Sequence, residues 1–228
     1  MARRKRTDGT GTDNPGISRS FGLRVFSQTN EKAGEIVFAS PENLPIVLFI
    51  MKYPTVFHLI STLSRDRDAP CVLIGGFAVN YYKVTRQTAD LDFLIMAKDF
   101  KKIVKLLEEE GYEENYSQEV FSRLTTDSDY LLDLDFMFVD GETLSKIINK
   151  GRVIEIAEQK FIVPSLDHLI ALKLHSIKHN PGLRKEKDLS DIIELIKANE
   201  VDIGSNDFKD ICLKYGTREL YEEILTKI

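Results

Sequence analysis

Apolar residues are spaced differently in the two parts of this chain. Apolar runs such as 71–74 and 91–96 are too short for helices and predict buried strands. After Pro164, apolar residues recur three and four positions apart, which is the spacing of amphipathic helices. We therefore expect a mixed α/β part followed by a helical part, with the change near residue 164.

Helices and strands are interleaved in the first part. Gly111 follows an amphipathic stretch and is a typical helix stop, and Pro164 ends a hairpin pattern. The predicted helices cover 55–65, 76–83 and 99–110, and the predicted strands cover 71–74, 91–96, 119–125, 130–138, 152–156 and 160–163. This order predicts an α/β (α+β) fold class, in which a small mixed sheet is flanked by helices.

The second part contains only helical patterns. Ser165 is a good N-cap for the first of its helices. The predicted helices cover 166–179, 186–199, 206–214 and 217–227. Together they predict a C-terminal helical bundle.

The N-terminal segment has no comparable pattern. Residues 1–20 join a basic start to a Gly/Thr/Asp stretch and are expected to be disordered. Residues 21–50 are compatible with an extra hairpin or a strand packed on the domain. The predicted domains are 1–50, a partly disordered extension, 51–164, the core, and 165–228, the helical domain.

Composition limits the class of protein. The 228 residues are 43% hydrophobic and 29% charged, which is typical of a globular chain, and the formal net charge is −5. This acidic total argues against an obligate nucleic-acid coat but allows a local basic cleft. No apolar run approaches the ~20 residues of a membrane helix, so we expect a cytoplasmic protein with no membrane partner. Cys71 and Cys212 are interpreted as small buried hydrophobes in a reducing compartment.

The candidate chemistry begins with two aspartates on one predicted strand. Asp90 and Asp92 alternate with Leu91, so they project from the same face. Two carboxylates on one face repel each other unless a cation lies between them, and Mg²⁺ prefers such hard oxygen ligands. Gly75 and Gly76 end the strand before them, and glycine lets a backbone approach phosphates closely.

A third carboxylate is expected on a neighbouring strand. Asp133 and Asp135 share one face of the predicted strand 130–138. We favour Asp135 as the metal ligand or general base, because the apolar run after it resembles a central strand. Asp133 remains the alternative.

These residues resemble the DNA polymerase beta nucleotidyltransferase superfamily, whose signature is Gly-Gly or Gly-Ser, an acid-apolar-acid pair and a later single acid. Within it, the chain is most similar to the minimal nucleotidyltransferases of the AbiEii toxin type and their uncharacterised relatives. The similar motifs are Gly75-Gly76-Phe77-Ala78, the Arg86 to Asp92 segment with Thr88, Lys173 after Pro164-Ser165, and the pattern of Arg184, Lys187, Asp188 and Asp191.

The resemblance implies transfer of a nucleoside monophosphate from a nucleoside triphosphate, such as ATP, to an acceptor hydroxyl. Its implied cofactor is Mg²⁺ or Mn²⁺, and its implied partners are an RNA, tRNA or protein acceptor and, for a toxin, an antitoxin. The implied catalytic residues are Asp90, Asp92, Asp135 and Lys173, the first three being the metal ligands, and the implied nucleotide-binding residues are Gly75, Gly76, Arg86, Thr88, Arg184, Lys187 and Asp188.

Three alternatives stay open at this point. The chain could be a toxin of a toxin–antitoxin pair with the same chemistry. It could instead be a non-catalytic nucleotide-binding or interaction module that keeps the fold. A small-molecule modifier, such as an antibiotic-adenylating enzyme, is the third alternative.

Overall fold

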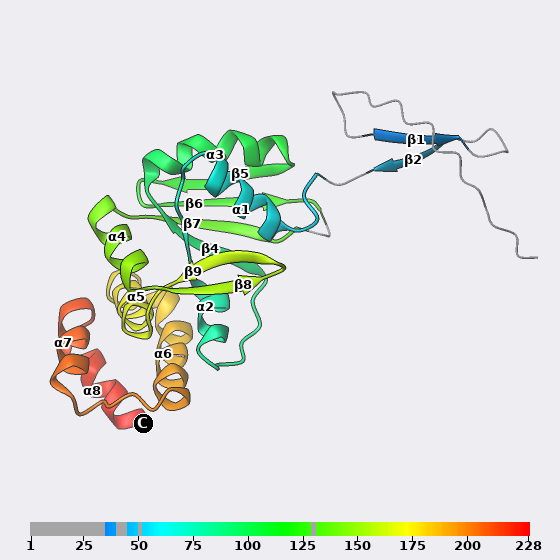
Figure 1. Cartoon of the computed structure of the whole chain (residues 1–228). Coiled ribbons are helices and arrows are strands. Elements are labelled where there is room, and N and C mark those ends of the chain that lie inside the picture. The colour runs from blue at the N-terminus through cyan, green and yellow to red at the C-terminus, as the bar shows by residue number, and fades with distance from the viewer. Residues whose placement is uncertain (1–34, 40–44, 50–51, 129–130) are drawn as a thin grey trace, which may run out of the picture. The chain divides into compact units, whose positions relative to one another are not determined.

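The computed structural model describes residues 35–39, 45–49, 52–128 and 131–228, and the chain divides into two units, Met1–Lys52 and Tyr53–Ile228 (Figure 1). In the first unit, β1 (Glu35–Ala39) and β2 (Pro45–Phe49) pair antiparallel. This confirms a hairpin within 21–50. The predicted disorder of residues 1–20 lies outside the described residues.

The second unit is built around a mixed sheet of five strands. Its order is β3-β4-β7-β6-β5, and β4 and β7 are parallel while the other neighbours are antiparallel. The small mixed sheet expected from the sequence is therefore confirmed. The strands are β3 (Val72–Leu73), β4 (Asp90–Ile95), β5 (Tyr112–Gln118), β6 (Phe121–Thr126) and β7 (Asp133–Phe138).

Both faces of the central strands carry apolar side chains. On one face, Phe93 of β4 stacks on Phe136 of β7 with ring centroids 5.6 Å apart, in the main core. On the other face, Leu94 packs with Leu144 in a smaller cluster. Asp90 and Asp92 lie on this second face, at the start of β4, where the apolar cover ends. The helices of this part are α1 (Val56–Asp66), α2 (Gly75–Tyr81), α3 (Ala97–Glu109) and α4 (Gly141–Lys150).

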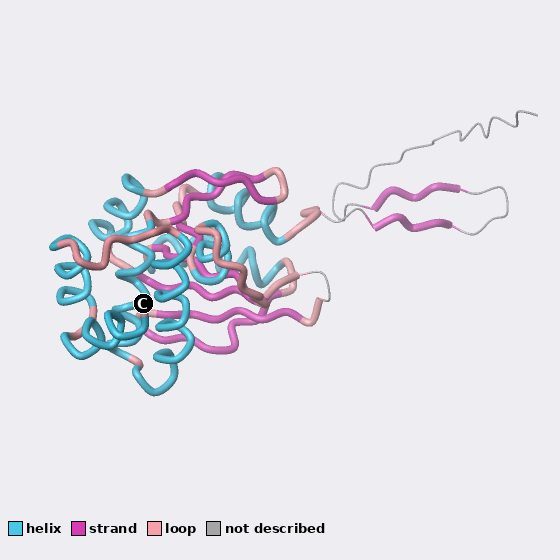
Figure 2. Tube along the Cα trace, turned by 90° about the horizontal axis from the view of Figure 1, so that it is seen from below, coloured by secondary structure: helices cyan, strands magenta, loops and turns pink. Residues whose placement is uncertain are grey.

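The remaining helices follow a second hairpin, and Figure 2 shows them in cyan with the strands in magenta. The hydroxyl of Ser165 accepts a hydrogen bond from the His168 N–H and so caps α5 as predicted. The elements are β8 (Arg152–Ile156), β9 (Gln159–Val163), α5 (Leu166–His179), α6 (Pro181–Ala198), α7 (Asn206–Tyr215) and α8 (Arg218–Lys227). The division into domains at residue 164 stays a prediction.

Three differences from the predicted elements concern the site. The apolar pattern predicts no element over β5 or α4. Helix α6 begins at Pro181 rather than at residue 186, because proline at the first helical position needs no hydrogen-bond partner for a backbone N–H. The earlier start places Arg184 and Lys187 within the first two turns of α6.

Candidate active site

Three carboxylates converge at the start of the two parallel strands. The pairing of β4 with β7 sets Asp92 opposite Asp135, so both project from the same face of the sheet. One carboxylate oxygen from each of Asp90, Asp92 and Asp135 lies within 4.8 Å of the others. We call this group the carboxylate triad. Its spacing and its hard oxygen donors fit a divalent cation such as Mg²⁺.

Asp133, the alternative third acid, is not in this group. It lies opposite Asp90 in the register of β4 and β7, and its carboxylate accepts a hydrogen bond from the Thr126 N–H at 3.4 Å. The structure therefore brings Asp135, the favoured residue, to the pair on β4.

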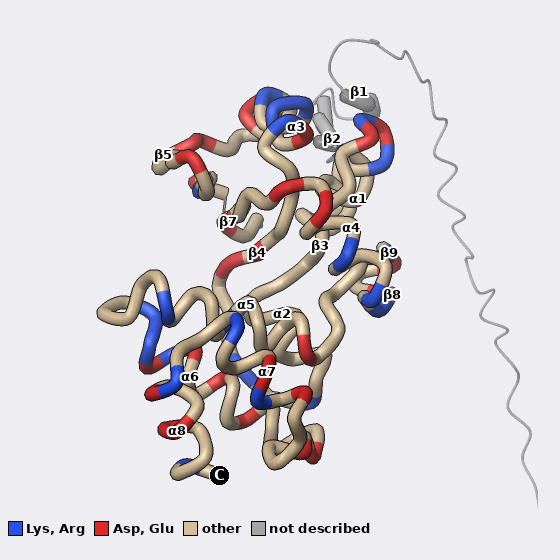
Figure 3. Tube along the Cα trace, turned by 90° about the vertical axis from the view of Figure 1, so that its left-hand side faces the viewer, with Lys and Arg blue, Asp and Glu red and all other residues tan. Residues whose placement is uncertain are grey.

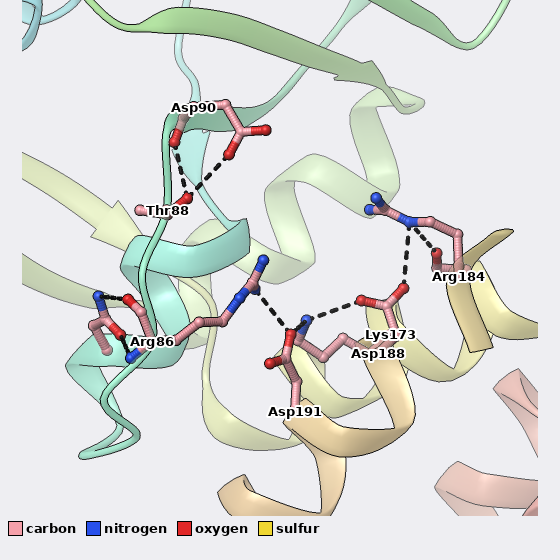
Figure 4. Close-up of polar contacts among 9 residues, drawn as sticks. Arg86, Thr88, Asp90, Lys173, Arg184, Asp188 and Asp191 are labelled. Carbon is pink, nitrogen blue, oxygen red and sulfur yellow. Dashed lines mark hydrogen bonds and ion pairs between the residues drawn. The ribbon is translucent and has the colours of Figure 1, made fainter. Parts of the chain in front are cut away.

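The two glycines lie against the acidic segment. Gly75 has a positive φ of 61°, and a Cβ there would lie 1.8 Å from Oδ2 of Asp92. A Cβ at Gly76 would lie 2.6 Å from the side chain of Thr88. Thr88 in turn donates its hydroxyl hydrogen to Asp90, 3.0 Å from Oδ1 (Figure 4). The absence of a side chain at both glycines thus leaves space for Asp92 and Thr88. This steric role is separate from any contact of the glycine backbone with phosphates.

Gly75→Ala is expected to destabilise the protein by about 2–4 kcal/mol, because the new Cβ adds a clash with Asp92 to the strain of a positive φ. Urea unfolding measures this loss. Gly111→Ala is the matched control, since Gly111 also has a positive φ but a Cβ there meets nothing within 4 Å. Its expected cost is about 1 kcal/mol, and equal losses for the two variants would contradict the predicted clash.

The triad is electrostatically strained. Burial raises the pKa of Asp92 to about 6, and the charges of Asp90 and Asp135 add to the rise. Burial also raises the pKa of Asp135, against the lowering effect of its hydrogen bonds to Arg123. Burial and the neighbouring negative charges thus disfavour the charged form of Asp92, and a cation bound between the carboxylates would offset this effect.

Arg123 was not among the residues predicted for the site. It lies on β6 directly opposite Asp135, and its Nε and Nη2 donate to the two oxygens of Asp135 at 2.7 and 2.9 Å. Its Nη2 also reaches Oδ2 of Asp90 at 3.4 Å. The guanidinium thus contacts two members of the carboxylate triad.

A second polar cluster joins the sheet part to α5 and α6. Lys173 is only 6% exposed, and its ammonium donates to Asp188 at 3.1 Å and to Asp191 at 2.5 Å. Arg86 donates to the same Asp191 at 2.9 Å, and Arg184 lies 3.4 Å from Asp188 (Figure 4). We call these five residues the ion network. Lys173 is therefore held by two carboxylates rather than projecting from the helix surface.

Basic residues near the start of α6 also act on the triad. The charges of Arg184 and Lys187 lower the pKa of Asp92 and so oppose the effect of burial. Figure 3 shows basic positions of α6 in blue and acidic positions of β4 in red. The start of α6 thus supplies positive charge near the carboxylates.

The comparisons with known proteins assign a family. A family of uncharacterised nucleotidyltransferases matches residues 57–227, which is most of the chain. The chain belongs to this family and is an enzyme of the nucleotidyltransferase class, in agreement with the resemblance to the superfamily. No curated protein matches it.

The chain is also similar, at low identity, to solved structures of nucleotidyltransferases. The antibiotic-resistance factor ANT(2'')-Ia is 16% identical, with a TM-score of 0.45, covering 74% of this chain and 86% of its own. The lincosamide antibiotic adenylyltransferase LnuA is 19% identical, with a TM-score of 0.43, covering 60% of this chain and 91% of its own. A nucleotidyltransferase from Thermotoga maritima described as putative is 17% identical, with a TM-score of 0.42, covering 57% of this chain and 89% of its own.

The AbiEii-like subgroup is not confirmed by these matches.

No helix among the described residues is both long and apolar enough to span a bilayer.

Proposed function

We propose that this protein transfers a nucleoside monophosphate from a nucleoside triphosphate to an acceptor hydroxyl and requires a divalent metal. The observation that carries the proposal is the convergence of Asp90, Asp92 and Asp135 within 4.8 Å, in a chain of the nucleotidyltransferase family. Together the triad would hold Mg²⁺ or Mn²⁺, which when bound offsets charge on the phosphates and on the attacking and leaving oxygens.

The reaction forms a bond between the acceptor oxygen and the α-phosphorus and breaks the bond to the leaving pyrophosphate. Asp135 would act as the third metal ligand or would accept the proton of the acceptor hydroxyl. Arg184 and Lys187, whose charges already act on Asp92, would bind the triphosphate oxygens. The backbone at Gly75 and Gly76 would lie beside the phosphates.

The ion network suits Lys173 and Asp188 to a structural role rather than to direct contact with the nucleotide. Because the Lys173 ammonium is buried between two carboxylates, we assign it the positioning of α5 and α6 against the segment that carries Arg86 and Thr88. Arg86 is held by Asp191 through Nη1, and its other guanidinium N–H groups would bind a phosphate. Lys173 would therefore support transfer through the position of α6 and its basic residues.

The acceptor is proposed to be an RNA, such as tRNA, or a protein. The finer proposal is that this protein is a toxin in the cytoplasm with an antitoxin as its partner. The toxin role is favoured because residues that carry the AbiEii resemblance meet in the ion network. These residues are Arg86, Lys173, Arg184, Asp188 and Asp191. Growth arrest on expression that Asp90→Ala relieves would support a toxin.

Asp135→Asn is expected to reduce nucleotidyl transfer at least about 100-fold, because it removes one of the three charges that bind the cation. The assay follows label from α-³²P-labelled ATP, CTP, GTP and UTP into RNA, protein and small molecules, with Mg²⁺ or with EDTA. Asp133→Asn, on the same strand but outside the triad, is the matched control and should retain transfer.

The outcomes separate the alternatives. Equal transfer by wild type and Asp135→Asn would refute the proposed role of the triad. Nucleotide binding in calorimetry without transfer to any acceptor would instead favour a non-catalytic binding module. Label on an aminoglycoside or lincosamide alone would favour a small-molecule modifier.

A further inference from the structure

The position of Arg123 has a consequence for metal binding. Both oxygens of Asp135 accept hydrogen bonds from its guanidinium, and the same Nη2 reaches Asp90. A cation that binds Asp135 must therefore share an oxygen with the Arg123 guanidinium or displace it, and at Asp90 it meets the same guanidinium beside Oδ2.

The geometry favours displacement from at least one carboxylate. The contact with Asp90 is the longer one, at 3.4 Å, whereas the two bonds to Asp135 form a fork at 2.7 and 2.9 Å. The Arg123 side chain is 42% exposed, so it can leave Asp90 without crossing packed core. Asp135 is 9% exposed and fixed by its strand.

We propose that the Arg123 guanidinium competes with a divalent cation for the carboxylate triad. By contacting Asp90 and Asp135, Arg123 lowers the affinity of the triad for the metal. This inference rests on the proposed function, because it concerns the same metal site. Its consequence is weak binding of a divalent cation to the free protein. Metal loading would then depend on a further partner for the cation, and the oxygens of a nucleoside triphosphate are the chemical class that fits.

The test measures metal binding to purified full-length protein without nucleotide. Mn²⁺ is titrated in, and free Mn²⁺ is read by electron paramagnetic resonance. Arg123→Gln is expected to bind Mn²⁺ at least about tenfold more tightly than wild type, because a positive charge next to the ligands is removed. Arg218→Gln, which removes the same charge from an exposed ion pair on α8, should bind as wild type does.

Arg123→Lys separates the effect of the two hydrogen bonds to Asp135 from the effect of the positive charge. A lysine keeps the positive charge but cannot bind both oxygens of Asp135 in parallel, so tightening should lie between wild type and Arg123→Gln. If Arg123→Gln does not fold, as judged by circular dichroism, Arg123→Lys decides alone. Tighter binding than wild type supports competition, and equal or weaker binding overturns it.

Failure of this inference can be told apart from failure of the proposed function. If Asp92→Asn loses Mn²⁺ binding while Arg123→Gln binds as wild type does, the metal site stands and the competition is refuted. If neither wild type nor Arg123→Gln binds Mn²⁺ alone, and Asp135→Asn also transfers nucleotide as wild type does, the triad is not a metal site and both proposals fall.

Discussion

Asp92→Asn should reduce the rate of nucleotidyl transfer by at least about 10³-fold. Without metal and above pH 6, the same variant should have a higher free energy of unfolding than wild type. The loss of transfer follows from removing a metal ligand whose cation supplies several kcal/mol of charge stabilisation. The gain in stability follows from the burial that raises the pKa of Asp92 to about 6. Function and stability are thus expected to move in opposite directions at this residue.

The direction of the pH effect follows from proton binding. Between about pH 4 and pH 6 the folded protein holds a proton on Asp92 that the unfolded chain has already released. The contribution of Asp92 to the stability of wild type therefore falls as the pH rises through this window, by up to about 3 kcal/mol for a pKa rise of about two units. Asp92→Asn carries no such group and should escape this loss.

Urea unfolding in EDTA at pH 4.5 and pH 8 measures the effect. The free energy of unfolding of Asp92→Asn should approach that of wild type at pH 4.5 and exceed it at pH 8. Asp66→Asn, at an exposed position on α1, should follow wild type at both values. A difference between Asp92→Asn and wild type that stays constant with pH would contradict the burial argument.

Lys173→Met is expected to lower the free energy of unfolding by about 3–5 kcal/mol. The substitution keeps most of the side-chain volume but leaves the carboxylates of Asp188 and Asp191 buried without their shared ammonium. Removing the buried shared partner is costly because each buried carboxylate then keeps only one cation, Arg184 for Asp188 and Arg86 for Asp191. Urea unfolding at pH 7 measures the loss.

Lys185→Met is the matched control for this substitution. Lys185 pairs with Glu223 at 2.8 Å, but its side chain is 47% exposed, and exposed pairs contribute about 1 kcal/mol or less. Adding Asp188→Asn to Lys173→Met should recover part of the loss. If Lys173→Met and Lys185→Met were equally stable, the buried network would not hold α5 and α6 as proposed.

The centre of the site could be predicted because strand geometry is simple. Alternation along β4 puts Asp90 and Asp92 on one face, and the length of the apolar run after Asp135 indicates a strand beside it. The nucleotidyltransferase class was indicated by the resemblance to a known superfamily that the order of these acids and the glycine pair carries. The structure brings these three carboxylates together.

The contacts made by basic residues could not be predicted in the same way. Arg123 stands in a predicted strand, but its contact with Asp135 depends on which residues β6 and β7 set opposite each other. Strand β5, with the sequence YEENYSQ, is almost wholly exposed, so no apolar alternation marks it. Arg86 and Asp191 are 105 residues apart, and only the packing of α6 against the segment before β4 brings them together.

The tight contact of Gly75 with Asp92 also links two positions in the history of the family. Exchange of this carboxylate for a small neutral side chain would remove the contacts at 1.8 and 2.4 Å, but the positive φ and the Cβ of residue 92 at 2.7 Å would still disfavour alanine at the glycine position. Relatives that keep the acid are therefore expected to keep the glycine.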